Sequence, residues 1–333
     1  MKKIVLVFVL IAVVAAVWFA STKNFFRKEA VAPIKIGILF KGSNFKQVAD
    51  GFMQGFSENL PKDRSVEYIV KNEPGSDQKD YDDSAQAFID SKVDLILAIG
   101  FEPVTAAKKV TAVNKIPVIL ELGVNPATQG IVADFLKPGG NITGISWQVE
   151  ELTGKRLEFL RLIDPSVKRI TIFKRKGSKI MDLPLKYLAS LKEEFALTIT
   201  VREFEELADL QREVLATTAT NTDAIFYASD PFVQRNSPLL IKRAIEQKIP
   251  VMFHDDFITK QGATASYGAN FPAAGKQGAR QATKILFDNK LPGELPIEVV
   301  SKVDFAINLA TAKAIGLSIP DEVVSLAQIV IKE

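Results

Sequence analysis

The sequence predicts an α/β protein built from two doubly wound parallel-sheet lobes and preceded by an N-terminal hydrophobic helix. Short apolar runs alternate with helical patterns, and this alternation starts again after residue 150. Such alternation is typical of βαβ units around a buried parallel sheet. Two lobes of roughly 100 to 150 residues also suit a chain of this length.

The N-terminal segment predicts export. Lys2 and Lys3 precede an uncharged apolar run over residues 4–20, whose length lies between that of a secretory signal core and that of a membrane span. A cleaved signal peptide and an uncleaved inner-membrane anchor are both open, because Trp18 and Phe19 ahead of basic residues are typical of interfacial anchoring. A buried helix of a cytoplasmic protein is the third alternative. We expect a periplasmic or extracytoplasmic protein, tethered to the cytoplasmic membrane if uncleaved, with residues 1–32 as signal or anchor plus linker.

Strands and helices alternate through the first part of the chain. Compact apolar runs predict strands at 34–40, 65–71, 94–99 and 116–120. Helical spacing predicts helices at 45–60, 83–91 and 103–113, the last with Pro103 in its first turn.

Residues 137–148 (KPGGNITGISWQ) predict the first crossing between the lobes. Pro138, Gly139 and Gly140 end one segment, and a β-prone run follows. Its central Gly144 suits a strand that bends or admits a close backbone approach.

The alternation then repeats. Helices are expected at 150–163, 183–195, 207–217 and 238–247, and strands at 169–174, 198–202, 224–228 and 250–253. The remaining elements are too few for a third domain: a strand at 263–267, a helix at 273–287, a β-prone run at 296–303 and a helix at 306–315. We therefore assign 33–145 and 266–297 to lobe 1, and 146–265 and 298–333 to lobe 2.

Composition excludes several classes of function. The absence of cysteine excludes disulfides, thiolate metal sites, cysteine nucleophiles and N-terminal cysteine lipidation. Residues 1–33 carry a net charge of +4, so the remaining 300 carry −1 and nothing favours a nucleic-acid partner. Common hydrolase, zinc-protease and nucleotide-binding motifs are absent. The sole histidine, His254, is expected to be hydrogen-bonded or exposed, and we predict no metal and no cofactor.

The loops at the carboxyl ends of the strands are the expected place for a ligand. They mix hydrogen-bonding groups, aromatic rings and charges of both signs, which suit a small polar or zwitterionic ligand between two closing lobes. Carboxylates would bind an amino group, helix N-termini a carboxylate, and rings an apolar side chain. The candidate ligand-binding residues are Ser43, Asn44, Phe101, Glu102, Asn125, Trp147, Lys174, Asp230, Phe232, Asp255, Tyr267 and Asn270.

Several candidates also have a purely structural interpretation. Ser43, Asn125 and Asp230 could cap the helices that follow them and have no contact with a ligand. Glu102 could interact with a helix dipole alone, and Tyr267 could pack in the core. The basic loop that begins at residue 174 could be solvated or attract an anion.

Four segments carry a family resemblance: 137–146 (KPGGNITGIS), 308–322 (NLATAKAIGLSIPDE), Asn125-Pro126 ahead of 130–132 (GIV), and 260–263 (KQGA) leading to Gly268. Together they resemble the ABC-transporter substrate-binding family that includes tryptophan- and tyrosine-binding members. The resemblance covers about residue 33 to the C-terminus. It implies a type I periplasmic binding protein fold with three crossovers, hinge closure on a ligand, and delivery to an ABC permease and ATPase complex.

Among the candidates, Asp230 and Asp255 fit the family pattern best. The loop at 100–103 (GFEP) is one residue longer than the G-T-P of the family, and 173–177 (FKRKG) stands where the family often has a Y-N-P-G loop. The resemblance therefore implies the scaffold more firmly than the ligand.

The leading hypothesis is a non-enzymatic, extracytoplasmic solute-binding component of an ABC importer, with a small polar or amino-acid-like ligand. A membrane-tethered extracytoplasmic ligand sensor is the first alternative, and an enzyme on the same scaffold is the second. Neighbouring genes for a permease and an ATPase would favour the importer. Turnover of a bound compound would favour the enzyme.

Overall fold

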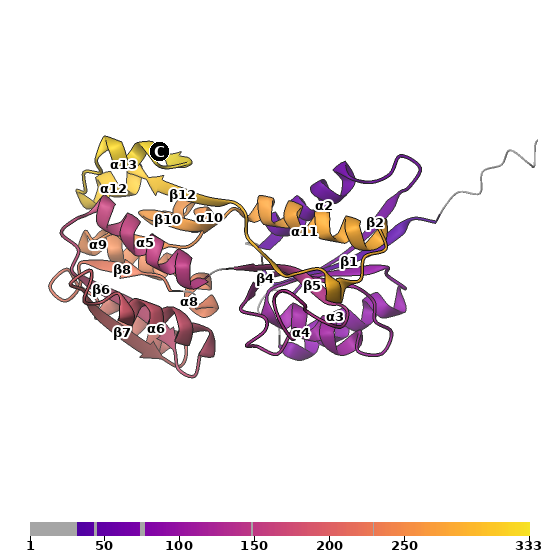
Figure 1. Cartoon of the computed structure of the whole chain (residues 1–333). Helices are drawn as coiled ribbons and strands as arrows, with labels where there is room; N and C mark the ends of the chain where they lie inside the picture. Colours follow the sequence, from indigo (N-terminus) through magenta and orange to yellow (C-terminus); the bar gives the residue numbers. More distant parts are fainter. Residues whose placement is uncertain (1–31, 43–44, 74–76, 148, 229) are drawn as a thin grey trace, which may run out of the picture.

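The computed structural model describes residues 32–333 apart from 43–44, 74–76, 148 and 229. These residues form two lobes side by side, each a central sheet with helices on both faces (Figure 1). The predicted α/β fold of two doubly wound sheets is confirmed for this part of the chain. The predicted N-terminal hydrophobic helix lies outside the described residues.

The sheet of the first lobe has six parallel strands in the order β11-β5-β4-β3-β1-β2. The strands are β1 (Ile34–Phe40), β2 (Val66–Asn72), β3 (Leu95–Ile99), β4 (Val118–Val124), β5 (Ile142–Trp147) and β11 (Glu298–Val299). One face packs against α2 (Lys46–Glu58) and α11 (Phe271–Leu286), the other against α3 (Gln78–Asp90) and α4 (Phe101–Val110). Because both faces are covered, β3 is buried along its whole length.

The sheet of the second lobe has seven strands in the order β13-β12-β10-β9-β8-β6-β7, and only β10 and β12 pair antiparallel. The strands are β6 (Arg169–Arg175), β7 (Thr198–Phe204), β8 (Ala224–Phe226), β9 (Val251–Phe253), β10 (Ala265–Ala269), β12 (Val303–Asn308) and β13 (Ile329–Ile331). Helices α5 (Val149–Ile163), α6 (Asp182–Ser190) and α13 (Asp321–Ser325) cover one face. The other face is covered by α7 (Leu207–Leu215), α8 (Pro231–Arg235), α9 (Ser237–Gln247) and α10 (Asp256–Lys260), and α12 (Leu309–Ile315) contacts α9.

The chain passes between the sheets at different points from those expected late in the sequence. β10 straddles the expected boundary at residue 266, yet it pairs with β9 and β12 of the second sheet. The chain returns to the first lobe with α11, and β11 pairs with β5, so the last passage follows Val299. The helix expected at 306–315 begins only at Leu309, because residues 306–308 belong to β12. The continuous apolar run there fits a buried strand as well as a helix.

The close backbone approach expected at Gly144 is confirmed. Its φ is +147°, and a Cβ at this position would lie 2.0 Å from the carbonyl oxygen of Leu120 on the neighbouring strand β4. A side chain here would therefore break the pairing of β4 with β5 next to the first crossing.

Two glycines let α11 dock directly on α2. A Cβ on Gly275 would lie 2.0 Å from the carbonyl oxygen of Val48, and one on Gly51 would lie 2.2 Å from that of Pro272. The backbones of the two helices thus touch with no side chain between them. This contact joins a late segment of the chain to the first lobe.

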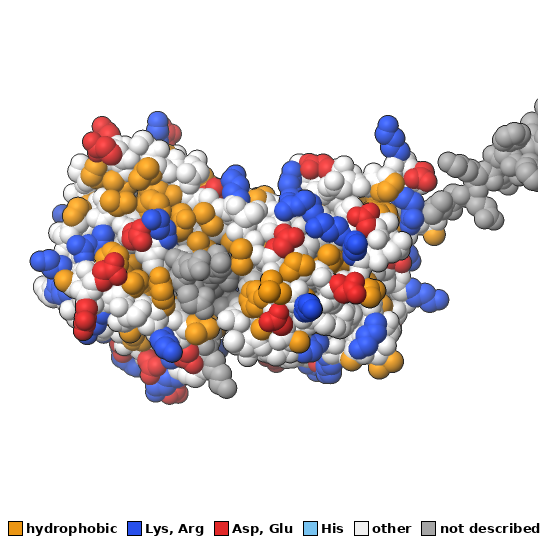
Figure 2. Space-filling model, viewed as in Figure 1, with side chains coloured by type: hydrophobic (Ala, Val, Ile, Leu, Met, Phe, Trp, Pro, Cys, Tyr) orange, Lys and Arg blue, Asp and Glu red, His pale blue; other side chains and the backbone are white. Residues whose placement is uncertain are grey.

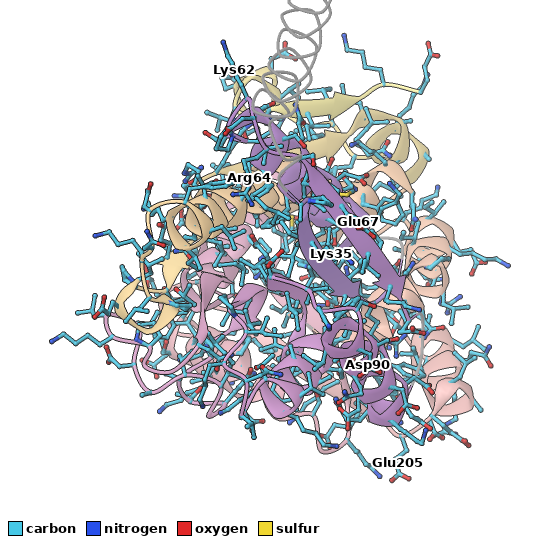
Figure 3. The ribbon with its side chains drawn as sticks, turned by 90° about the vertical axis from the view of Figure 1, so that its right-hand side faces the viewer. Lys35, Lys62, Arg64, Glu67, Asp90 and Glu205 are labelled. Atoms are coloured by element: carbon cyan, nitrogen blue, oxygen red, sulfur yellow. The ribbon has the colours of Figure 1, made fainter. Side chains whose placement is uncertain are left out.

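Figure 3 looks onto the end of the first lobe at which the described chain begins. The labelled residues Lys35, Lys62, Arg64 and Glu67 lie on and around β1 and β2 and carry charges of both signs. No helix in the described part of the chain is long and apolar enough to cross a membrane.

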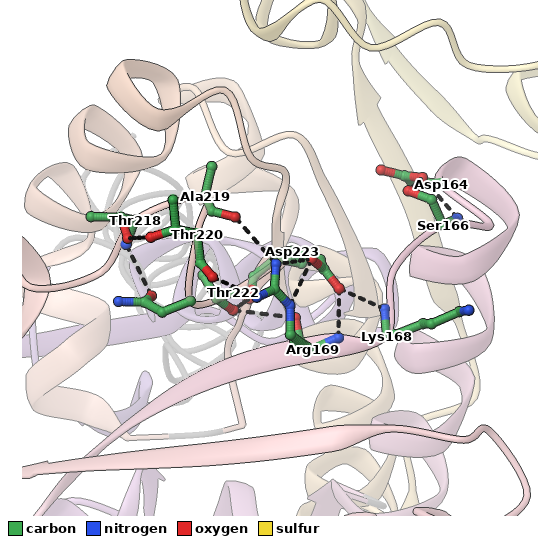
Figure 4. A network of polar contacts seen from close by, with 11 residues as sticks. Asp164, Ser166, Lys168, Arg169, Thr218, Ala219, Thr220, Thr222 and Asp223 are labelled. Carbon is green, nitrogen blue, oxygen red and sulfur yellow. Dashed lines mark hydrogen bonds and ion pairs between the residues drawn. The ribbon is translucent and has the colours of Figure 1, made fainter.

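An Asp–Arg network lies at the amino ends of β6 and β8 in the second sheet (Figure 4). Asp223 accepts hydrogen bonds from the backbone N–H groups of Lys168 and Arg169 at 2.9 and 2.7 Å, and from Nε and Nη2 of Arg169 at 3.0 and 2.7 Å. The Arg169 guanidinium also donates to the carbonyls of Ala219 and Thr220. Burial raises the pKa of Asp223, but these hydrogen bonds outweigh it and hold the pKa below its usual value.

Replacing Gly275 tests the helix contact. Gly275→Ala should lower the free energy of unfolding by about 1–3 kcal/mol through overpacking, although alanine is the better helix former. Gly154→Ala in α5 is the control, since its Cβ would meet only side-chain atoms of Tyr187 and Leu191, which can move aside. Urea denaturation measures both, and an equal loss in the two variants would contradict the backbone contact.

Replacing Asp223 tests the network. Asp223→Asn should cost about 1–2 kcal/mol at pH 7, because the negative charge opposite Arg169 is lost and an NH2 group, which cannot accept a hydrogen bond, replaces one of the two accepting oxygens. A carboxylate whose pKa is depressed on folding stabilises above its unfolded pKa of 3.8 and loses that effect as pH falls through the folded value. The urea midpoints of wild type and variant should therefore converge below about pH 4. A constant difference from pH 7 to pH 3 would rule the electrostatic role out.

Candidate functional site

A cleft of about 1170 Å³ lies between the carboxyl ends of strands from both lobes. In Figure 2 the two lobes meet at a narrower waist, with hydrophobic side chains on either side of it. The first lobe contributes Lys41, Phe101, Glu102, Asn125, Thr128 and Gln129. The second lobe contributes residues 175–178 after β6, Ile180 and Leu183, Glu205, and residues 230–232 and 235 at α8. This is the position that parallel α/β sheets offer to ligands.

Five of the residues expected from the sequence line this cleft: Phe101, Glu102, Asn125, Asp230 and Phe232. Three come from the first lobe and two from the second. The structure therefore brings residues that are more than a hundred positions apart into one space.

The first wall is built around the start of α4. Gly100 takes a φ of +98° directly before the helix, and Phe101 then projects with 45% of its surface exposed. Glu102 forms an ion pair with Lys41 at 2.7 Å. The Asn125 side chain accepts a hydrogen bond from the backbone N–H of Thr128 at 3.3 Å. It therefore caps a turn, not the helix that was expected to follow it, and also lines the cleft.

The second wall depends on Asp230. Its carboxylate accepts backbone N–H bonds from Arg175 at 2.9 Å, from Phe232 at 2.9 Å and from Val233 at 3.2 Å. It therefore caps α8 and ties the end of β6 to that helix. The side chain lines the cleft but is only 2% exposed.

An aromatic and cationic cluster stands on this wall. The Phe232 ring packs against Phe204, with 5.5 Å between ring centroids. The guanidinium carbons of Arg175 and Arg235 lie 5.1 and 5.7 Å from the Phe232 centroid, within the range of cation–π attraction. The candidate list omitted both arginines. The basic loop at 174–176 could have pointed to Arg175. For Arg235 the only sequence signal was its position three residues after Phe232, which places both on one face of a helix.

Asp255 belongs to the interior of the second lobe and does not line the cleft. It is 2% exposed, caps α10 by accepting the N–H of Ile258 at 2.9 Å, and accepts Nε2 of Gln234 at 3.1 Å. Nδ1 of the buried His254 lies 3.1 Å from its Oδ2. Burial raises the pKa of Asp255 to about 7, and burial together with the nearby Arg156 lowers the pKa of His254 well below its usual value.

Lys174 and Tyr267 do not line the cleft either. Lys174 faces Asp182 at 3.3 Å and Glu203 at 3.8 Å. Tyr267 packs against Phe159, with ring centroids 4.9 Å apart. These contacts satisfy the two side chains within the second lobe, which corrects their assignment as lining residues.

Asn270 is likewise structural. Its side chain accepts the N–H of Ala273 at 2.8 Å, which caps α11, and donates to Asp304 at 2.5 Å. Ser43 and Asn44 lie outside the described residues. So does the side chain of Trp147, whose backbone ends β5. Within the ranges that the structure describes, no three His, Asp or Glu side chains cluster so as to hold a metal ion.

Two doubly wound lobes around an aromatic and polar cleft define the type I periplasmic binding protein class. The chain belongs to the ABC transporter substrate binding protein family, whose model matches residues 34–331. The family resemblance of the sequence motifs is thereby confirmed.

Individual relatives are distant in sequence and close in fold. The chain is 22% identical over 284 residues to the tyrosine-binding protein of Clostridioides difficile (strain R20291). The aligned region covers 85% of this chain and 81% of that protein. It is similar to the ABC domain in complex with L-Trp from Streptococcus pneumonia, with a TM-score of 0.78 and 22% identity over 90% of this chain and 100% of that one. A ligand-free, open substrate binding protein with adhesive properties from Clostridium difficile gives a TM-score of 0.70 at 22% identity and the same coverage. At these identities the structural likeness shows the fold.

The buried Asp255 should make stability depend on pH. Its folded pKa of about 7 exceeds the ordinary value of 3.8, so the folded chain keeps a proton that the unfolded chain releases. Stability should therefore fall as pH rises from about 4 to about 7, and Asp255→Asn should remove part of this fall, on the order of 1 kcal/mol per pH unit. Urea midpoints at several pH values test it, since other titrating groups cancel between the two proteins. Parallel curves for wild type and variant would contradict the protonated, buried carboxyl.

Proposed function

We propose that this protein is the extracytoplasmic solute-binding component of an ABC importer, which holds a small amino-acid-like ligand between its lobes by hinge closure. The observation that carries the proposal is the cleft, whose facing walls come from different lobes and each present an aromatic ring beside polar groups. A solute that contacts both walls at once stabilises the closed arrangement by its differential affinity for it.

The apolar surface of the cleft supports a ligand with an apolar or aromatic side chain. Phe101 is large and 45% exposed, and Phe232, Ile180 and Leu183 add apolar area on the opposite wall. Covering such area with a ligand is favourable by about 25 cal/mol per Å². The relatives named for tyrosine and for L-Trp bind solutes of this kind. We extend that ligand class to this chain.

Partners and location follow from the same proposal. Family membership supports a permease and ATPase complex as the recipient of the solute. The basic start and the uncharged run at 4–20 support export and, if uncleaved, a tether to the cytoplasmic membrane. No bond of the ligand is broken in this cycle, which is one of binding, closure and release.

Aromatic amino acids should raise the melting temperature of the purified protein, because a ligand that binds only the folded form stabilises it. Phe101→Ala should then weaken binding by about 1–3 kcal/mol in calorimetry, since an apolar contact is lost. Val113→Ala is the matched control, because Val113 is 93% exposed and does not line the cleft.

Unchanged affinity in Phe101→Ala would contradict the cleft as the binding site. Uptake of the same solute by cells with and without the protein separates an importer from a tethered sensor. Undiminished uptake in cells that lack it would contradict the importer.

A further inference from the structure

We propose that Arg175 and Arg235 select the ligand by its carboxylate, and that no carboxylate of the cleft selects an ammonium group. The preferred ligand class is then a carboxylic acid with an apolar or aromatic body, whether or not it carries an amino group. This inference rests on the proposed solute-binding function and specifies how that function chooses its solute.

The two guanidinium groups contact the protein and still have N–H donors available for a ligand. Both guanidinium carbons lie over the Phe232 ring, and this cation–π contact uses none of their N–H donors. Nε of Arg175 donates to the carbonyl oxygen of Glu205 at 3.1 Å, which leaves its terminal nitrogens for a ligand. In the described ranges neither guanidinium forms an ion pair with a carboxylate.

The carboxylates of the cleft are already engaged. Glu102 pairs with Lys41 at 2.7 Å, and Glu205 pairs with Lys176 at 2.6 Å. Asp230 accepts three backbone N–H bonds and is almost fully buried. An ammonium group would have to share Glu102 or Glu205 with the lysine that already neutralises it, whereas a carboxylate would meet two arginines that have no acidic partner among the described residues.

Charge gives the same answer. The lining side chains include four basic and three acidic residues, and the basic residues without an acidic partner are the two arginines over Phe232. Two like charges on one ring repel each other, and an anion between them removes that repulsion. A single surplus positive charge matches a monoanion such as a carboxylate, which the planar arginine fork binds with two parallel hydrogen bonds.

Two matched sets of compounds test the inference by calorimetry on the purified protein. One set is L-tryptophan, 3-(indol-3-yl)propionate and tryptamine, and the other is L-tyrosine, 3-(4-hydroxyphenyl)propionate and tyramine. Within a set that binds, the acid without an amino group should bind within about tenfold of the amino acid, and the amine should be at least about a hundredfold weaker.

Arginine variants identify the residues. Arg235→Gln should weaken the amino acid and the propionate alike by about ten- to a hundredfold, and Arg235→Lys should recover only part of this, because lysine lacks the fork. Arg235 is exposed, so the melting temperature without ligand should not change. Arg212→Gln, on the exposed side of α7 beside Asp209, is the control and should bind as wild type does.

The outcomes separate this inference from the function on which it rests. Three outcomes would overturn the inference and leave a solute-binding protein. They are tight binding of the amine, failure of the propionate to bind when the amino acid does, and unchanged affinity in Arg235→Gln. If neither set binds, and no compound of a wider panel of amino acids and carboxylic acids does, the proposed function falls and the inference falls with it.

Discussion

The docking of α11 on α2 is the constraint on which the two-lobed architecture depends. Gly51 and Gly275 bring the two backbones into contact, and α11 reaches α2 only after the chain has built most of the second sheet. β11 then pairs with β5 before the chain leaves again for β12. Each lobe is therefore made of segments that are separate in the sequence. The connections between the lobes follow β5, β10 and β11.

The cleft walls are fixed mainly by main-chain contacts. Asp230 links the end of β6 to the start of α8 through three backbone N–H groups, so the position of Phe232 does not depend on mobile surface side chains. Gly100 orients the start of α4 and with it Phe101. A site that is arranged in this way before a ligand arrives loses less conformational freedom on binding.

The fold could be predicted from the sequence because its signals are local. Short apolar strands between amphipathic helices identified nearly every element as far as β9. The turn at 138–140 precedes β5, which still belongs to the first sheet, so the chain leaves the first lobe only after Trp147. The late chain was harder, because pairing decides it: nothing local shows that β10 lies between β9 and β12, or that residues 306–308 extend a strand.

The candidate site could be predicted only in part, for a related reason. Loop position found Phe101, Glu102, Asn125, Asp230 and Phe232, because the ends of parallel strands converge whatever their partners are. The same reasoning wrongly included Asp255, Lys174, Tyr267 and Asn270, whose side chains cap helices, form ion pairs or pack outside the cleft. It omitted Lys41, which pairs with the distant Glu102, and Arg235, which contacts the Phe232 ring.

The division of the first lobe between residues 34–147 and 271–299 has a consequence for folding during synthesis. Because the chain is made from its N-terminus, neither lobe can complete its sheet until almost the whole polypeptide has been synthesised. Until α11 has been made, the surface of α2 that it covers stays exposed. A chain truncated before residue 299 would lack β11 of the first sheet and β12 and β13 of the second, so both lobes would be incomplete.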